Sequence, residues 1–254
     1  MISLLVSSKT MQPSNCPYDV PTSIPLYLKE AEILDEYLKQ LSPLQLKRLM
    51  HLSPALADTT KQRVMSWGGL KKTPAWYTFV GDVYKGLKIN TFTKEDLDFA
   101  QEHLATLSGL YGILRPLDII HPYRLELGYK LKGRGFNNLY DFWTDKIALT
   151  IPLGESVINL ASEEYMKVLR PYLPKSQIIT PWFMQLKNGK PDFQAIHAKI
   201  ARGTMGRWIC NHKVNDPSQL KNFNYSGYSF QADLSGPSKP VFTRPEHYDF
   251  RADY

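Results

Sequence analysis

Lysine, aspartate and tyrosine side chains at two places in the sequence could take part in acid–base or nucleophilic chemistry. The first is Lys9, which follows the apolar, β-rich run Ile2–Val6 in the sequence Ser-Ser-Lys-Thr. The carboxyl end of a buried strand is where α/β sheets commonly place ligand groups. The amine of Lys9 could attack a sugar carbon if burial or cationic neighbours lowered its pKa. A solvated loop lysine is the alternative interpretation.

The second place is the stretch Ala75–Leu87, which reads as a strand that enters a turn. Gly81 and Gly86 bracket Asp82 and Tyr84, so we expect a carboxylate and a phenol on an exposed bend. A bend of this kind is more often a simple turn than a functional site. Asp82 and Tyr84 become candidates for lining a cleft only through the family resemblance given below.

Basic residues are clustered along a chain with a net charge of +7. Residues 187–213 contain six Lys/Arg and one acid, and residues 121–134 contain four and one. Such a distribution fits an anionic partner, although excess charge also serves solubility. In the first cluster, Lys199 and Arg202 are three residues apart on a helix expected from about 198, and therefore share one side.

The second cluster contributes Arg124 as a candidate. Glu126 follows two residues later and would share its face on a strand, so a pair within the chain is the alternative.

The stretch from Thr93 to Gly112 carries the most distinctive local pattern. Thr93 and Asp96 form a capping-box pattern, and apolar residues then recur at helical spacing as far as Leu107. Ser108–Gly112 follows, with glycines at both 109 and 112. A helix broken in this way resembles the hairpin of a helix–hairpin–helix motif, whose backbone amides hold a DNA phosphate. An ordinary helix end followed by a tight turn is the alternative.

Several classes of protein receive no support from the sequence. Cys16 and Cys210 are far apart and have no CxxC partner. The histidines are scattered, with no pair on one helical face, so no metal site and no cofactor are predicted. No apolar run approaches the length of a membrane helix, so no membrane contact is expected. Walker, GxGxxG and HExxH motifs do not occur.

Short β-rich runs alternate with helical periods along the whole chain, which predicts a mixed α/β (α+β) fold. We expect a single domain over residues 1–254, with a central mixed sheet flanked by helices and a helix–hairpin–helix-like element at about 94–118. The strands at Ile2–Val6 and Val157–Ala161 should form its centre. Asn188-Gly189 is a strong signal for a β-hairpin.

Motifs along essentially the whole chain resemble, in order, those of the YaaA-type family of bacterial peroxide-stress proteins. They are SSKT, FVGDVYKGL, LSGLYGILRPLD, PYRLELG, LYDFW, VINLAS, KNGK, AKIARG and GYSF. The resemblance implies a cytoplasmic protein that limits oxidative damage by lowering free iron, and that binds duplex DNA through a helix–hairpin–helix and a basic cleft. It also suggests that the two places of the opening paragraphs face one cleft.

Three function classes follow. The first is a stress protein, expected as a monomer, that binds the phosphate backbone of duplex DNA with little sequence specificity. Its DNA-binding candidates are Lys9, Ser108, Gly109, Leu110, Tyr111, Gly112, Arg115, Arg124, Lys199, Arg202 and Arg207. The second is an enzyme on a nucleotide or nucleobase, a glycosidic-bond hydrolase or lyase that uses Lys9 and Asp82, with Tyr84 and Arg124 as further candidates. The third is a partner-binding protein whose basic face only confers solubility.

Overall fold

A mixed five-stranded sheet forms the centre of the molecule, in the order β6-β5-β1-β8-β9. The structure is a computed structural model, and it describes residues 1–246 and 248. The strands of this sheet are β1 (Ile2–Val6), β5 (Leu104–Ser108), β6 (Gly112–Leu114), β8 (Val157–Asn159) and β9 (Ile178–Ile179). β1 pairs in parallel with β5 and β8, while β6 returns antiparallel to β5. The predicted fold class and both predicted central strands are confirmed.

A second sheet and two small ribbons complete the strands. The second sheet has the order β11-β10-β13-β12. Its strands are β10 (Trp182–Lys187), β11 (Lys190–Asp192), β12 (Ser229–Phe230) and β13 (Val241–Arg244). The ribbons pair β2 (Thr10–Met11) with β4 (Phe79–Val80), and β3 (Thr73–Pro74) with β7 (Ile119–Ile120). β10 and β11 form the hairpin predicted at Asn188-Gly189.

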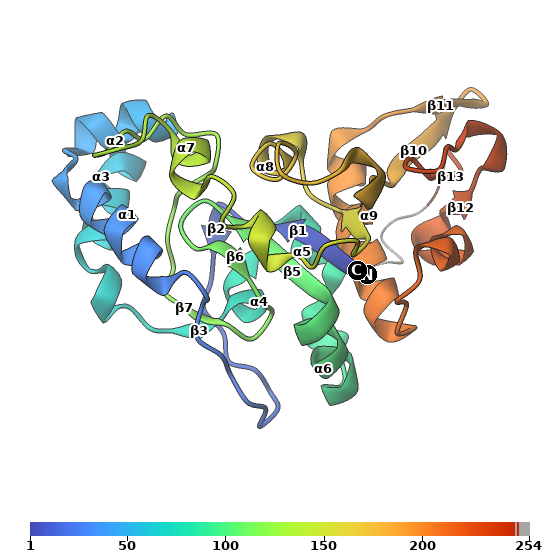
Figure 1. Cartoon of the computed structure of the whole chain (residues 1–254), viewed down its shortest axis with the longest axis horizontal. Helices are drawn as coiled ribbons and strands as arrows, with labels where there is room; N and C mark the ends of the chain where they lie inside the picture. The colour runs from blue at the N-terminus through green and yellow to red at the C-terminus, as the bar shows by residue number, and fades with distance from the viewer. Residues whose placement is uncertain (247, 249–254) are drawn as a thin grey trace.

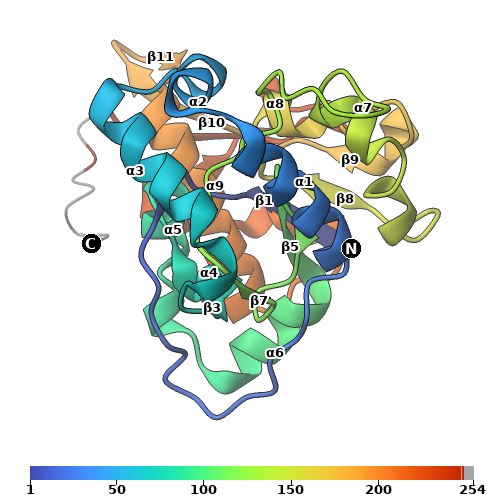
Figure 2. The ribbon, with the colours of Figure 1, turned by 90° about the vertical axis from the view of Figure 1, so that its left-hand side faces the viewer.

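The helices form two groups around the central sheet (Figures 1 and 2). α1 (Leu28–Gln40), α2 (Pro43–Met50) and α3 (Pro54–Met65) lie together on one side, with α7 (Leu139–Trp143) near them. α5 (Asp82–Leu87), α6 (Lys94–His103) and α9 (Ala195–Asn211) lie below and beside the sheet, and α4 (Ala75–Thr78) and α8 (Glu163–Met166) are short.

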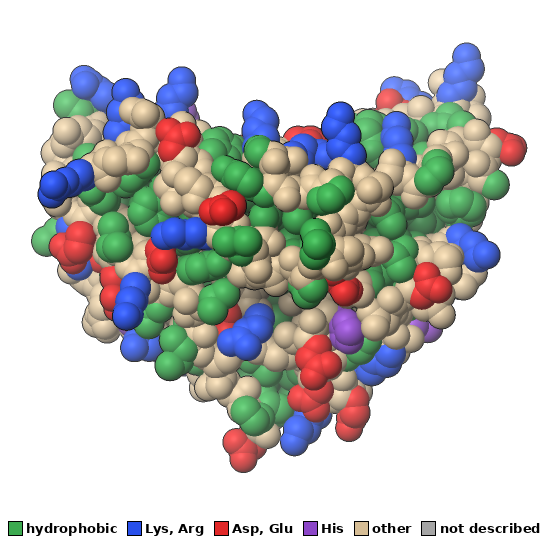
Figure 3. Space-filling view, viewed as in Figure 1, with side chains coloured by type: hydrophobic (Ala, Val, Ile, Leu, Met, Phe, Trp, Pro, Cys, Tyr) green, Lys and Arg blue, Asp and Glu red, His purple; other side chains and the backbone are tan. Residues whose placement is uncertain are grey.

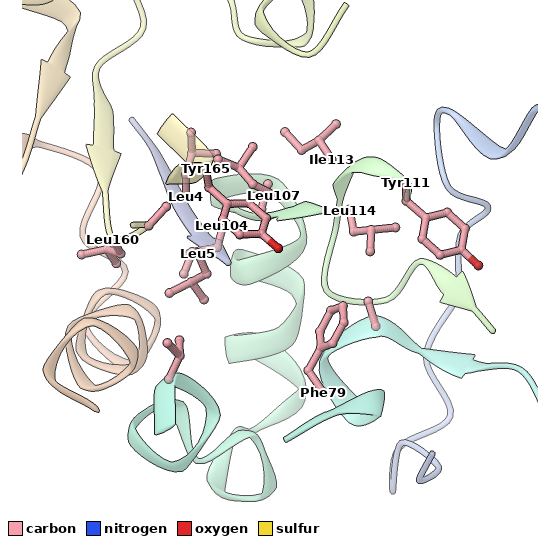
Figure 4. Close-up of a cluster of buried hydrophobic side chains, with 14 of the residues drawn as sticks. Leu4, Leu5, Phe79, Leu104, Leu107, Tyr111, Ile113, Leu114, Leu160 and Tyr165 are labelled. Atoms are coloured by element: carbon pink, nitrogen blue, oxygen red, sulfur yellow. The ribbon is translucent and has the colours of Figure 1, made fainter. Parts of the chain in front are cut away.

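The core follows from the position of β1 between two parallel neighbours. Leu4 and Leu5 are adjacent in sequence and both fully buried, because both faces of this strand are covered. In Figure 4 Leu5 points toward the helices, and Leu4 points to the opposite side, toward Tyr165. A parallel strand buried on both faces explains why four of the five residues in Ile2–Val6 are apolar.

Two local predictions are wrong. The helix that begins at the Thr93 capping box has both predicted cap hydrogen bonds, but it ends at His103 instead of continuing to Leu107. The stretch 75–87 is not one strand entering a bend: it contains α4, then β4, then α5. In the 193–197 segment, which could also be read as a strand, α9 has already begun at Ala195.

Candidate functional site

A polar cleft of about 420 Å³ opens at the carboxyl ends of β1 and β8. Its charged lining residues are Lys9, Asp82, Glu126, Glu164, Lys199 and Arg202; Ser7, Ser8, Tyr84, Ser162 and Tyr165 are the polar ones. The upper edge of the molecule, with α8 at its middle, is hollowed, and Lys and Arg side chains gather along it (Figures 1 and 3). Of the four residues that the family resemblance suggested for one cleft, Lys9, Asp82 and Arg202 line it, and Arg124 is not among its lining residues.

Lys9 is held at the cleft by the way the chain leaves β1. The amide of Ser7 still bonds the Leu107 carbonyl of β5, at 2.9 Å, and Ser8 then donates to the carbonyl of Val80. Thr10 pairs with Val80 in the β2–β4 ribbon, which brings Gly81 and Asp82 beside the Lys9 backbone. Gly81 has a φ of 137°, a conformation that side-chain-bearing residues rarely adopt. The Lys9 side chain is exposed, with its ammonium 6.0 Å from the centre of the Tyr129 ring.

Lys199 and Arg202 reach the cleft because α5 and α9 cross at very short distance. A Cβ on Gly203 would lie 1.7 Å from the Val83 carbonyl oxygen, and one on Gly86 would lie 2.0 Å from that of Ile200. Glycine is therefore required on both helices. The group that approaches Gly203 is the backbone of α5. The crossing places Lys199 and Arg202 in the same cleft as Asp82.

Glu126 is the main site residue that the sequence did not single out. It was considered only as a partner of Arg124, yet its carboxyl group is buried in the cleft. Burial raises the pKa of Glu126, and Lys9 and the Tyr165 hydroxyl act in the opposite direction. The one available signal was a lone acid between Leu125 and Leu127, two apolar residues that are themselves fully buried.

Buried hydroxyl groups form hydrogen bonds beneath the cleft, near Glu126. The Ser7 and Tyr165 hydroxyls are 3.1 Å apart, and those of Ser108 and Tyr123 are 2.6 Å apart. Burial raises the pKa of Tyr165 well above its usual value, and the negative charge of Glu126 acts in the same direction. These phenols are therefore neutral hydrogen-bonding groups around Glu126.

Tyr84 and Arg124 support the site from its edges. Tyr84 lies on α5, not on an exposed bend; it is buried and donates its hydroxyl proton to the Val6 carbonyl at 3.0 Å. The Arg124 guanidinium donates to the Lys9 carbonyl at 3.2 Å, and so holds the loop that carries the lysine. The hydrogen bonds of Tyr84 and Arg124 hold the backbone before Lys9, at Val6, and at the Lys9 carbonyl itself.

The helix–hairpin–helix prediction is wrong, because Ser108–Gly112 connects two strands. The five residues Ser108, Gly109, Leu110, Tyr111 and Gly112 are all buried between β5 and β6. A Cβ on Gly109 would lie 2.3 Å from the Leu125 carbonyl oxygen, and Gly112 has a φ of 70°. The glycines serve internal backbone packing, and the hairpin amides do not face a surface where a phosphate could bind.

Arg115 and Arg207 do not line this cleft. The Arg115 guanidinium bonds the buried carboxylate of Asp118 through Nε at 3.2 Å and Nη2 at 3.1 Å, near a separate cavity. Arg207 lies one turn beyond Arg202 on α9, with its guanidinium 5.4 Å from the centre of the Tyr225 ring. Arg115, which was expected to supply positive charge beside the hairpin, therefore stabilises the turn between β6 and β7 through Asp118.

The residues that the structure describes contain neither a cluster of metal ligands nor a helix that could cross a membrane. Among residues 1–246 and 248, no three His, Cys, Asp or Glu side chains lie together as metal ligands would. Within the same residues, the longest helices are too short or too polar to cross a bilayer.

The arrangement combines three cationic groups with three carboxyl groups in one open cleft. Asp82 pairs with Lys85 at 3.1 Å, and the Glu164 carboxylate accepts the Gly128 amide at 3.1 Å, so both acids have partners inside the protein. Lys9, Lys199 and Arg202 remain oriented toward the cleft. The fold and site define a mixed α/β protein with a charged cleft at the carboxyl edge of its central sheet.

The chain belongs to the family described as peroxide stress protein YaaA, whose model matches residues 1–234. Among similar proteins, a UPF0246 protein of Ralstonia nicotianae is 40% identical over 254 residues, covering 96% of this chain and 99% of its own. A UPF0246 protein of Ruegeria pomeroyi is 42% identical over 237 residues, covering 89% and 93%. Membership of this family supports a role in peroxide stress.

Proposed function

We propose that this peroxide-stress protein binds the phosphate backbone of duplex DNA, largely without sequence specificity, in the cleft around Lys9. The observation that carries the proposal is the meeting of Lys9, Lys199 and Arg202, from distant parts of the chain, at one hollowed edge (Figure 3). Phosphate neutralisation by such groups supplies most of the affinity of non-specific DNA binding. Bound protein would shield DNA during peroxide stress.

Burial strengthens one of these cations as an anion-binding group. Burial lowers the pKa of Arg202, and the charge of Glu163 acts in the opposite direction; an arginine stays protonated under either influence. A half-buried guanidinium interacts with a phosphate more strongly than an exposed one does, since less water screens it. Lys9 and Lys199 are exposed and can follow the backbone on either side.

Salt dependence of DNA affinity tests the proposal. Each phosphate contact contributes a slope of about −0.9 in log affinity against log salt. We expect Lys9→Ala and Lys199→Ala each to reduce the magnitude of the slope by about one unit. Lys94→Ala is the matched control, because Lys94 is an exposed lysine at the start of α6, on the opposite side of the molecule (Figures 1 and 2). A cleft double variant with the slope of the control would overturn the proposal.

Lowering of free iron, which the family resemblance implies, stays a prediction. It is separable from DNA binding, because the cleft variants above remove positive charge without touching His or Cys. Measuring chelatable iron in peroxide-treated cells that carry Lys199→Ala tests whether the two effects depend on the same surface. An iron level equal to that with wild-type protein would assign the iron effect to another part of the chain.

A second candidate function is a glycosidic-bond lyase, favoured by Glu126 in the same cleft as Lys9. The amine form of Lys9 would attack C1′ of a nucleoside, and the C1′–N bond would break with its electron pair passing to the base. Protonated Glu126 would give its proton to the departing base, and its raised pKa suits that role. The lysine adduct would lose its extra proton to water. The nitrogen lone pair would then form the C=N bond as the C1′–O4′ bond breaks, and the remaining N–H proton would pass to O4′, which leaves a neutral imine and a free hydroxyl.

Borohydride trapping separates this candidate from simple binding. Reduction of the imine leaves a stable covalent link between protein and DNA, so a trapped product is expected with wild-type protein and peroxide-damaged DNA. Lys9→Ala should give none, whereas Lys199→Ala should reduce the yield only through weaker binding. Equal trapping by wild type and Lys9→Ala would remove Lys9 as the nucleophile.

A further inference from the structure

A second cavity, of about 210 Å³, shares Arg202 with the cleft. It lies where the chain enters β10 beside the start of α9. Thr180, Pro181, Trp182, Phe183, Phe193, Ala198, Arg202 and Glu163 line it. Since Arg202 lines both spaces, a polymer whose phosphate contacted this guanidinium could extend from the cleft to the second cavity.

Two exposed aromatic rings stand at this cavity. Trp182 is 38% exposed and Phe193 is 51% exposed, and their ring centres are 6.3 Å apart at 53°. The other four tryptophans are each at most 6% exposed. Large aromatic side chains left in solvent beside a charged cleft suggest a binding surface more than a packing role.

Lys239 adds a cation to the same place. Its ammonium lies 3.8 Å from the centre of the Trp182 ring, and the lysine itself is exposed. The indole face therefore accepts a cation, and the group that covers it is an exposed side chain that a ligand could displace. The carboxylate of Glu163, the acid in this cavity, is bonded by Arg170 at 2.8 Å.

We propose that Trp182 and Phe193 form a stacking subsite for an unpaired nucleobase, next to the phosphate-binding cleft. The inference rests on the proposed DNA binding and adds a preference for strands with unstacked bases. Stacking on aromatic rings tolerates any base, because every base has a π face. The incoming base displaces the Lys239 ammonium from the indole, and the ammonium then pairs with a phosphate of the same strand.

Intrinsic fluorescence gives a direct readout, since Trp182 is the tryptophan that solvent and ligand reach. Addition of a single-stranded thymidine oligonucleotide of about 16 residues should quench wild-type emission. Trp182→Phe should show almost no quenching yet keep most of the affinity, because phenylalanine still stacks. Trp182→Ala should bind this oligonucleotide about tenfold more weakly and bind blunt duplex within about twofold of wild type. Leu153→Ala, at a leucine that is 94% exposed, is the control for loss of an exposed apolar side chain.

The outcomes separate the subsite from the cleft. If wild type binds duplex with a steep salt slope but the oligonucleotide leaves its fluorescence unchanged, the cleft stands and the subsite is overturned. Equal weakening of single-stranded and duplex binding by Trp182→Ala also overturns the subsite, because a general loss reports a disturbed fold. If wild type binds neither nucleic acid, the proposed function fails and the subsite fails with it.

Discussion

The β5–β6 hairpin and the cleft around Lys9 differ in what their polar and glycine residues do. In the hairpin, these residues make contacts within the protein interior. The Ser108 hydroxyl bonds the Tyr123 hydroxyl. Gly109 leaves room for the Leu125 backbone, and Gly112 leaves room for the Trp143 ring. In the cleft, Lys9 and Lys199 are exposed, and no close packing depends on their side chains. The glycine-broken motif at Ser108–Gly112 is the more distinctive in sequence, yet it lies in the buried region, where a DNA phosphate cannot reach the backbone amides.

This difference gives a rule for reading glycine-broken motifs. A glycine pair predicts close approach of something to the backbone, and the approaching group is found by asking what else must pack there. In this chain the approaching groups are internal at 109, at 112 and at 203. The hairpin should therefore respond to substitution through stability, and the cleft through binding.

The largest effect is expected at the hairpin. In Gly109→Ala the added Cβ would lie 2.3 Å from the Leu125 carbonyl oxygen, so the backbone must shift, at a cost of about 3 kcal/mol in the free energy of unfolding. Gly68→Ala is the matched control, because nothing lies within 4 Å of its added Cβ. Chemical denaturation of both variants measures the difference. Equal stabilities would mean that the hairpin is not packed as described.

A smaller loss is expected for Arg115→Ala, which removes two of the donors to the Asp118 carboxylate. Asp118 is buried and keeps the Arg115 amide and the Ser23 hydroxyl, so the expected cost is about 1–2 kcal/mol. The slope of log DNA affinity against log salt should stay that of wild type. If the folded variant lost about one unit of this salt slope, Arg115 would be part of the DNA-binding surface after all.

Glu126 gives the cleft a pH-dependent contribution to stability. Burial raises its pKa above the usual 4.5, so the folded protein holds this proton more tightly than the unfolded chain. Stability therefore falls as pH rises from 4.5 through the folded-state pKa, and the loss is complete above it. Glu126→Gln carries no charge and lacks this loss.

Thermal unfolding from pH 4 to pH 8 checks this effect. The melting temperature of Glu126→Gln relative to wild type should rise across the interval and then stay constant. Glu164→Gln is the control, since Glu164 lines the same cleft but is exposed. A pH-independent difference for Glu126→Gln would show that its carboxyl group does not titrate out of its usual range.

Sequence patterns predicted the parts of this molecule that depend on near neighbours. Ile2–Val6, the Thr93–Asp96 cap and the Asn188-Gly189 hairpin follow from local spacing, and all three are present. The helix expected to reach Leu107 failed because Leu104 and Leu107 suit a helix face and a fully buried strand equally well. The pairing of Leu104–Ser108 with β1, about a hundred residues away, decides between them.

The cleft was predictable in part for the same reason. Position at a strand end marked Lys9, and family resemblance joined it to Asp82 and Arg202. The local sign for Glu126 is its place between Leu125 and Leu127, and this does not predict the cleft, because the burial of Glu126 depends on the ends of β1 and β8 meeting the loop that carries it. The spacing of apolar residues along the sequence does not predict long-range contacts of this kind.

The smallest effect on stability is expected for a lysine of the cleft, in contrast to the glycine of the hairpin. Lys199→Ala should change the free energy of unfolding by less than about 0.5 kcal/mol, because the side chain is exposed and close helix packing in its turn comes from Gly203. The same variant should lose about one unit of salt slope in DNA binding. Lys94→Ala, equally exposed, should leave both quantities unchanged. If Lys199→Ala destabilises the fold as much as Gly109→Ala does, the cleft lysine serves structure, and the division between a packing hairpin and a binding cleft fails.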